Sequence, residues 1–361
     1  MSRPFALVAV IAALLLAPAP GLSRPGDRTP AAIAASPPAA DAAVTRVAFG
    51  SCLQQNRPAP ILDAINAFAP DTFVFLGDNV YGDTRDMARL AAAYRTLGET
   101  PGYRALREHA RVLAVWDDHD MGENDAGREY PHKAESKRIM LDFFGEPPDS
   151  PRRAREGNYG SVTLGPPGRR VQFVLLDTRW FRDPLKEDPS AERKTYVPND
   201  DPEATLLGGR QWSWLEETLT APAEVRVICT SLQVFSDKHR FEKWGNFPRE
   251  RARLIELLRK RAGDVLILSG DRHSGEISVD QWHDGRRGNV MVEVTASALN
   301  QTRTREGGRD EPNDYRAGPI LYAPNFGTLE IDWDARLVTV SLRDEQGAPA
   351  KQVQLRMSEA K

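Results

Sequence analysis

Four apolar segments of this sequence are each followed, within a few residues, by side chains that can bind a metal ion. The segments are 44–49, 72–76, 112–116 and 265–268. The side chains that follow them are, in the same order, Cys52, then Asp78 and Tyr81, then Asp118 and His119, and finally Asp271 and His273. If the segments are strands of an open α/β sheet, their carboxyl ends bring these thiol, phenol, imidazole and carboxyl groups to one edge. Such acids would repel one another without cations, so the pattern predicts a metal site.

Each motif has a second interpretation when it is taken alone. Gly77-Asp78 after a strand is also typical of a helix N-cap, and a single cysteine such as Cys229 is usually a packing residue. Isolated histidines are interpreted as structural residues, namely His109, His132 and His283. A disulfide between Cys52 and Cys229 is a further alternative in an oxidising compartment. The conjunction of four motifs is what favours metal binding.

Short apolar segments alternate with helical patterns along the rest of the chain. Strands are predicted at 44–49, 72–76, 112–116, 171–176, 225–229, 265–268, 290–294, 328–333 and 338–342. Helices are predicted at 59–68, 85–96, 133–144, 210–219 and 249–261. Continuous apolar strands such as 112–116 are typical of sheets covered on both faces, and the last two strands have the pattern of a hairpin. The sequence therefore predicts an α/β protein with more than one sheet, and polar loops at 123–130, 183–202 and 301–315.

Composition excludes several classes of protein. The chain has 361 residues, 40% of them apolar, and a net charge of −3, which suits one large domain or two small ones with a substantial core. The slight acidity argues against dedicated nucleic-acid binding. Two cysteines cannot form a disulfide scaffold, and one long apolar run excludes a multi-pass membrane protein.

That apolar run, at residues 5–17, has the pattern of a secretory signal. Arg3 precedes it and Ala17-Pro18-Ala19 follows, while a bilayer crossing needs about 20 apolar residues. We therefore expect a cleaved signal peptide at 1–23, an Ala/Pro-rich flexible linker at 24–43 and the main folded domain at 44–361. This predicts a periplasmic or secreted protein without a stable membrane span after processing. An uncleaved N-terminal membrane anchor is the alternative.

Seven motifs carry a resemblance to a known family. In chain order, between residues 49 and 278, they are GSC, GDNVY, WDDHD, LLDTRWFRD, GGRQWSWL, KWGNFPRERARL and SGDRHSGEI. Together they resemble the alkaline phosphatase D (PhoD-like) family of the calcineurin-like metallophosphoesterases. The resemblance implies a four-layer αββα sandwich, with two mixed β-sheets flanked by helices. It also implies hydrolysis of small-molecule phosphate mono- or diesters with two metal ions, Fe³⁺ and Ca²⁺ being favoured over Zn²⁺ and Mn²⁺.

The resemblance assigns ligands residue by residue. It implies that Asp78 bridges both metals, and that Cys52 and Tyr81 bind iron, for which two anionic donors are suitable. The implied metal ligands are Cys52, Asp78, Tyr81, Asp118, Asn124, Asp271 and His273. The oxygen-rich second site suits a hard cation such as Ca²⁺. An extra residue, Gly122, separates His119 from Asn124 and leaves that ligand open, and Gln233 stands where the superfamily has a further histidine.

The implied mechanism is in-line attack on phosphorus by a metal-bound hydroxide. His119 is expected to orient substrate or protonate the leaving oxygen, with Asp120 fixing its tautomer, or else only to support the ligands. Arg179 and Arg182 are candidate phosphate clamps. Trp244 and Phe247 are interpreted as lining a substrate cleft, with covering of the core as the alternative.

A phospholipase-type hydrolase of phospholipid head groups and an inactive binding homologue are the alternative functions. The chain is expected to act as a monomer.

Overall fold

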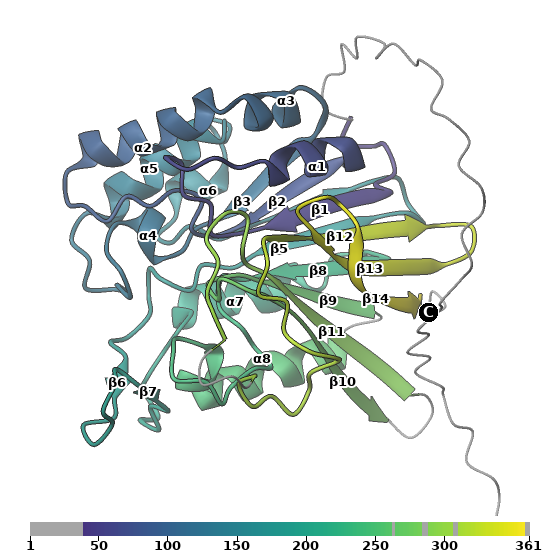
Figure 1. The fold of residues 1–361 in the computed structure, drawn as a ribbon. Helices are drawn as coiled ribbons and strands as arrows, with labels where there is room; N and C mark the ends of the chain where they lie inside the picture. Colours follow the sequence, from purple (N-terminus) through teal and green to yellow (C-terminus); the bar gives the residue numbers. More distant parts are fainter. Residues whose placement is uncertain (1–38, 262–263, 284–287, 306–309, 358–361) are drawn as a thin grey trace, which may run out of the picture. The chain divides into compact units, whose positions relative to one another are not determined.

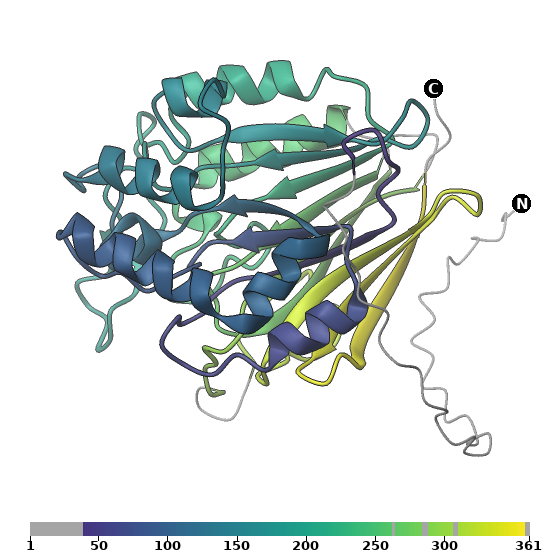
Figure 2. The same ribbon diagram turned by 90° about the horizontal axis from the view of Figure 1, so that it is seen from above.

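Two six-stranded sheets lie face to face, with helices on the outer face of each (Figures 1 and 2). The computed structural model describes residues 39–261, 264–283, 288–305 and 310–357. The predicted signal peptide and most of the predicted linker lie outside the described residues. The four-layer αββα architecture is confirmed.

The first sheet combines three parallel strands with an antiparallel meander. Its order is β14 (Pro349–Arg356), β13 (Leu337–Asp344), β12 (Asn325–Asp332), β1 (Arg46–Gly50), β2 (Thr72–Leu76) and β3 (Arg111–Val115). Strands β1, β2 and β3 run parallel, and β12 pairs antiparallel to β1. The carboxyl ends of the three parallel strands therefore lie at one edge.

The second sheet is also mixed. Its order is β10 (Gly275–His283), β11 (Gly288–Ala296), β9 (Asp264–Ser269), β8 (Val225–Cys229), β5 (Val171–Leu175) and β4 (Gly160–Leu164). Strands β11, β9, β8 and β5 run parallel, while β10 and β4 pair antiparallel to their neighbours. A small separate ribbon joins β6 (Lys186–Glu187) to β7 (Tyr196–Val197).

Three apolar layers follow from the alternation of side chains along the strands. In β2, Val74 and Leu76 face the core between the sheets, while Phe73 and Phe75 face helices. The first sheet is covered by α1 (Ile61–Phe68), α2 (Met87–Glu99), α3 (Pro101–His109) and α5 (Lys133–Phe143). The second is covered by α7 (Gly208–Thr218) and α8 (Pro248–Arg261). Three short helices complete the fold, namely α4 (Asp118–Met121), α6 (Pro151–Ala154) and the 3₁₀ helix η1 (Trp244–Asn246).

The predicted strands and helices are all present, with ends shifted by a few residues. Strands β4, β10 and β14, helix α3 and the three short helices were not predicted, and the short ribbon of β6 and β7 lies in the predicted polar loop 183–202. Helix α3 buries only Tyr103 and Leu106, so its apolar pattern is short, and Pro101 at its first turn separates it from α2. Within the described part of the chain, no helix has the length and apolar character needed to cross a membrane.

Candidate metal centre

The predicted ligands lie on loops at the carboxyl ends of strands, in an unusual backbone conformation. The φ angles of Cys52, Asp78, Asp271 and His273 are 62°, 50°, 64° and 52°. Left-handed backbone is uncommon for residues other than glycine and costs about 1–3 kcal/mol at each position. Among the described residues, four of the eight non-glycine positions with a positive φ are thus predicted ligands.

Two groups of donor side chains meet at this edge, and Asp78 belongs to both. The first contains Cys52, Asp78 and His273, and the second contains Asp78, Asp118 and His119. Within each group the possible ligand atoms all lie within 4.8 Å of one another. We call these five residues the donor cluster.

Tyr81 joins the donor cluster through its hydroxyl group. This oxygen lies 3.3 Å from Oδ2 of Asp78 and 3.0 Å from Nε2 of His273. Sγ of Cys52 lies 3.4 Å from the same carboxylate oxygen. The structure therefore brings together a thiol, a phenol, an imidazole and a carboxyl group.

The buried oxygens of the cluster fit a bound cation. Asp78 is 1% exposed and Asp118 is 3% exposed. Within the described residues, Oδ1 of each accepts no hydrogen bond, although Oδ1 of Asp118 lies 3.6 Å from Nη2 of Arg179. A buried carboxylate oxygen without a partner is costly, and a metal ion would satisfy it.

In the metal-free protein, burial disfavours the charged forms of several of these groups. Burial raises the pKa of the Cys52 thiol to about 11. Burial, together with the charge of Cys52, raises the pKa of Asp78, and burial with the charge of Asp117 raises that of Asp271. Burial lowers the pKa of His273 to about 4, which keeps its imidazole in the neutral form that binds metals. A cation would favour the ionised acids.

Asp271 and Asn124 are less closely placed than the other predicted ligands. Asp271 belongs to neither donor group, although it lies in the same loop as His273. Asn124 is exposed, and its side chain makes no hydrogen bond within the described ranges. The next residue, Asp125, instead donates its backbone N–H to Oδ2 of Asp118 at 2.6 Å.

The backbone conformation and the close packing at position 122 explain why the extra residue is a glycine. It ends α4 with a φ of 147°, and a Cβ atom there would overlap the hydroxyl group of Tyr130. Gly77 is similarly constrained, because a Cβ atom there would lie 2.6 Å from Cβ of Asp117. Both glycines allow the ligand loops to approach each other.

His119 is oriented by Asp83 and not by Asp120. Nδ1 of His119 lies 2.6 Å from Oδ1 of Asp83, and its ring packs 4.3 Å from that of Tyr81. Burial alone would lower the pKa of His119, but Asp118, Asp78 and Asp83 together raise it to about 11.

The prediction for Asp120 is corrected here. Its carboxylate accepts hydrogen bonds from the backbone N–H groups of Asp117 and Asn79, at 2.5 Å and 3.2 Å. Consecutive residues on a helical turn point in different directions, so Asp120 faces inward while His119 faces the site.

A second acidic group adjoins the donor cluster and shares Asp118 with it. It contains Asp118, Asp125 and Glu242, and we call it the paired acid cluster. Arg179 lies 2.5 Å from Glu242, Arg182 lies 3.3 Å from Glu242, and Lys194 lies 2.6 Å from Asp125. Basic side chains thus already supply the charge that a cation would bring.

The candidate phosphate clamps lie inside this network. The Arg179 side chain is 0% exposed and that of Arg182 is 1% exposed. Arg179 also binds Asp117 through Nε at 2.5 Å. This placement favours a role in holding carboxylates over direct contact with substrate.

The aromatic residues of segment 237–251 pack in the core, which corrects the cleft interpretation. Trp244 and Phe247 are buried in the layer between the second sheet and its helices. Nε1 of Trp244 donates to Oγ1 of Thr230 at 3.1 Å. Gln233 is also buried, and its amide donates to Glu276 and Thr295.

Both cysteines are free thiols, so the alternative disulfide is not formed. Cys229 packs in the core between the sheets. Sequence reasoning missed Asp83, Asp125 and Glu242, although the first stands five residues after Asp78 in the same loop.

Comparisons with known proteins agree with this geometry. A family model described as PhoD-like phosphatase matches residues 48–342. The solved structure of PhoD shares 18% sequence identity at a TM-score of 0.66, over 87% of this chain and 69% of that one. The structure of GAP50, the anchor in the inner membrane complex of Plasmodium, shares 13% identity at a TM-score of 0.57, over 88% and 90%. At these identities the structures show a common fold alone. No curated protein sequence matches the chain.

The predicted resemblance is confirmed by a family match that covers most of the chain. The protein belongs to the PhoD-like phosphatase family and is a phosphoesterase.

Proposed function

We propose that this protein is an exported, metal-dependent hydrolase of small phosphate mono- or diesters, of the alkaline phosphatase and phosphodiesterase type, acting as a monomer. The observation that carries the proposal is Asp78, a buried carboxylate shared by two donor groups with one oxygen lacking a hydrogen-bond partner. A carboxylate in this position is suited to bridging two cations. Export rests on the apolar run at 5–17 and the small residues after it.

The donor types suggest different cations for the two sides of Asp78. Fe³⁺ would be held by Cys52, Tyr81, His273 and Asp78, because thiolate and phenolate offset its high charge. Ca²⁺ would be held by Asp78 and Asp118, which share a donor group, with Asp271 and Asn124 as further ligands proposed from the sequence motifs. Bound there, the cations would supply positive charge for the phosphoryl oxygens and a water molecule of lowered pKa.

His119 is the proposed proton donor to the leaving oxygen. Its Nδ1 atom lies 2.6 Å from Oδ1 of Asp83, which fixes the orientation of the ring. This leaves Nε2 as the nitrogen that can donate a proton to substrate.

Arg179 is proposed as a positioning residue. It binds Asp117 and Glu242 and lies 3.6 Å from Asp118, so it fixes one side of the donor cluster from behind. The phosphate would then be neutralised by the cations and His119.

Metal analysis combined with two assays tests the proposal. We expect the purified full-length protein to contain iron and to hydrolyse p-nitrophenyl phosphate, its bis ester or both. Cys52→Ala should lose iron and turnover, because the thiolate ligand is removed. Cys229→Ala is the matched control, since it removes the other buried thiol and should keep both properties. Wild-type protein without iron, or full turnover in Cys52→Ala, would contradict the assignment.

A further inference from the structure

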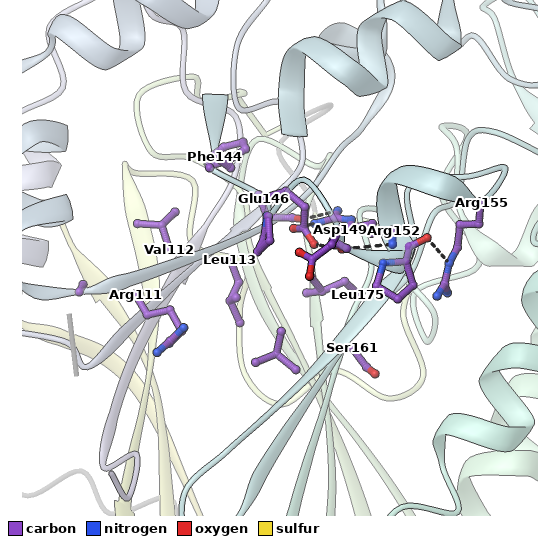
Figure 3. Close-up of a pocket in the computed structure, with 18 of the residues that line it drawn as sticks. Arg111, Val112, Leu113, Phe144, Glu146, Asp149, Arg152, Arg155, Ser161 and Leu175 are labelled. Atoms are coloured by element: carbon purple, nitrogen blue, oxygen red, sulfur yellow. Dashed lines mark hydrogen bonds and ion pairs between the residues drawn. The ribbon is translucent and has the colours of Figure 1, made fainter. Parts of the chain in front are cut away.

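A groove of about 740 Å³ opens between the edge strands of the two sheets, β3 and β4. Figure 3 shows Arg111, Val112 and Leu113 on one side of it and Arg152 and Arg155 on the other. None of its lining residues belongs to the donor cluster or to the paired acid cluster. Its volume is in the range of small-molecule sites.

The floor of the groove is part of the apolar core. Leu113 and Leu175 belong to the cluster between the sheets, and Val162 packs against it. Phe144 and Trp214 add aromatic surface. A hydrocarbon chain in the groove would therefore continue the core of the sandwich and remove its apolar surface from water.

The rim is cationic. The groove is lined by four arginines and by only two acids, Glu146 and Asp149. The arginines are Arg107, Arg111, Arg152 and Arg155. Arg152 is 7% exposed, lies 3.6 Å from Glu146 and otherwise binds backbone carbonyl groups. Arg155 packs 4.8 Å over the ring of Tyr159 and 5.7 Å over that of Trp214. Guanidinium groups beside apolar surface suit an anionic head on a hydrocarbon chain.

Arg152 also argues against an extended peptide as the occupant. Its Nη2 atom donates to the carbonyl oxygen of Ala114 at 2.8 Å, on the outer side of β3. A peptide adding to this edge needs that acceptor for its own backbone. One acceptor that a new strand would need is therefore already taken.

We propose that this groove binds a single-chain anionic amphiphile of the fatty-acid type. The chain lies along Leu113, Val162 and Leu175, and the carboxylate lies near Arg107 and Arg155 at the rim. This site is separate from the phosphoesterase centre and does not depend on the metal assignment.

Quenching of tryptophan fluorescence by a dibrominated stearate tests the proposal, because Trp214 lines the groove. We expect saturable quenching of the full-length protein below the critical micelle concentration, and loss of most of it in Trp214→Phe. Val162→Asp should weaken binding at least tenfold, since it places a charge on the apolar floor. Thr163→Asp is the matched control, because Thr163 is the next residue of β4, is exposed and does not line the groove.

A second comparison tests the role of charge. Arg107→Gln should weaken binding about threefold to tenfold, while Arg104→Gln, an exposed arginine of the same helix outside the groove, should have no effect. The brominated alcohol of the same chain length should bind less tightly than the acid. Quenching that does not saturate, equal binding of acid and alcohol, or equal loss in Thr163→Asp would overturn the proposal. Displacement of the stearate by a glutamate-rich peptide would assign the groove to an acidic protein segment instead.

Discussion

The donor cluster and the paired acid cluster meet at Asp118 and are both largely buried, yet they are neutralised differently. Glu242 and Asp125 face the fixed charges of Arg179, Arg182 and Lys194. Asp78 instead faces imidazole, phenol and thiol groups, whose protons can leave. Arginine keeps its proton at any pH that a protein survives, so the first arrangement holds structure. The second has groups that could release protons when cations bind, which is what the proposed metal site requires.

The largest expected effect is on turnover, and it follows from replacing His119 in the donor cluster. His119→Ala should lower turnover about 10²–10⁴-fold on an ester with a poor leaving group, because the proton donor is lost. The loss should be much smaller with p-nitrophenol as the leaving group, which departs without protonation. Steady-state rates on phenyl and p-nitrophenyl phosphate measure the difference. Equal losses on both substrates would place His119 among the supporting residues.

The fixed charge of the paired acid cluster should matter for folding. Arg179→Met is expected to lower the free energy of unfolding by about 3–5 kcal/mol, because it leaves Asp117 and Glu242 buried with less compensation. Denaturant titration of the metal-free protein measures this. Arg169→Met is the control, since Arg169 and its partner Asp334 are exposed and should contribute about 0–1 kcal/mol. Equal effects of the two substitutions would remove the contrast between the clusters.

A smaller effect, on the free energy of unfolding, is expected when metal ions are added back to the metal-free protein. At a hundred times the dissociation constant, binding should stabilise the wild type by about 2.7 kcal/mol, seen as a rise in melting temperature. Glu242→Gln should show a similar rise, while Asp78→Asn should show little, because only Asp78 belongs to both donor groups. A normal rise in Asp78→Asn would mean that cations bind elsewhere, with the paired acid cluster as the first candidate.

The layers of the sandwich and the main candidate metal donors could be predicted from the sequence, because both follow from local patterns. Apolar runs such as that of β2 indicate a strand covered on both faces, and Asp78 and Tyr81 stand directly after it. The edge strand β4 was missed because exposed and half-buried residues alternate along most of it, which leaves a weak apolar signal.

The partners of the donors could not be predicted in the same way. Glu242 is 124 residues from Asp118 in the sequence, and only the packing of the loop before η1 against α4 and the loop after it brings them together. Asp83 and Asp120 are both close to His119 in the fold, and which of them contacts the imidazole depends on the direction of one helical turn. The pattern of residue types does not specify that direction.

The left-handed backbone of Cys52, Asp78, Asp271 and His273 places an unfavourable main-chain conformation at four proposed metal ligands. Glycine would relax the main chain at each of them, and would delete a donor in doing so. A screen for thermostable variants that does not measure catalysis would therefore favour substitutions at these positions. It would yield more stable proteins that have lost proposed metal ligands. The four positions with the least favourable backbone conformation are therefore also the positions at which the proposed metal site tolerates substitution least.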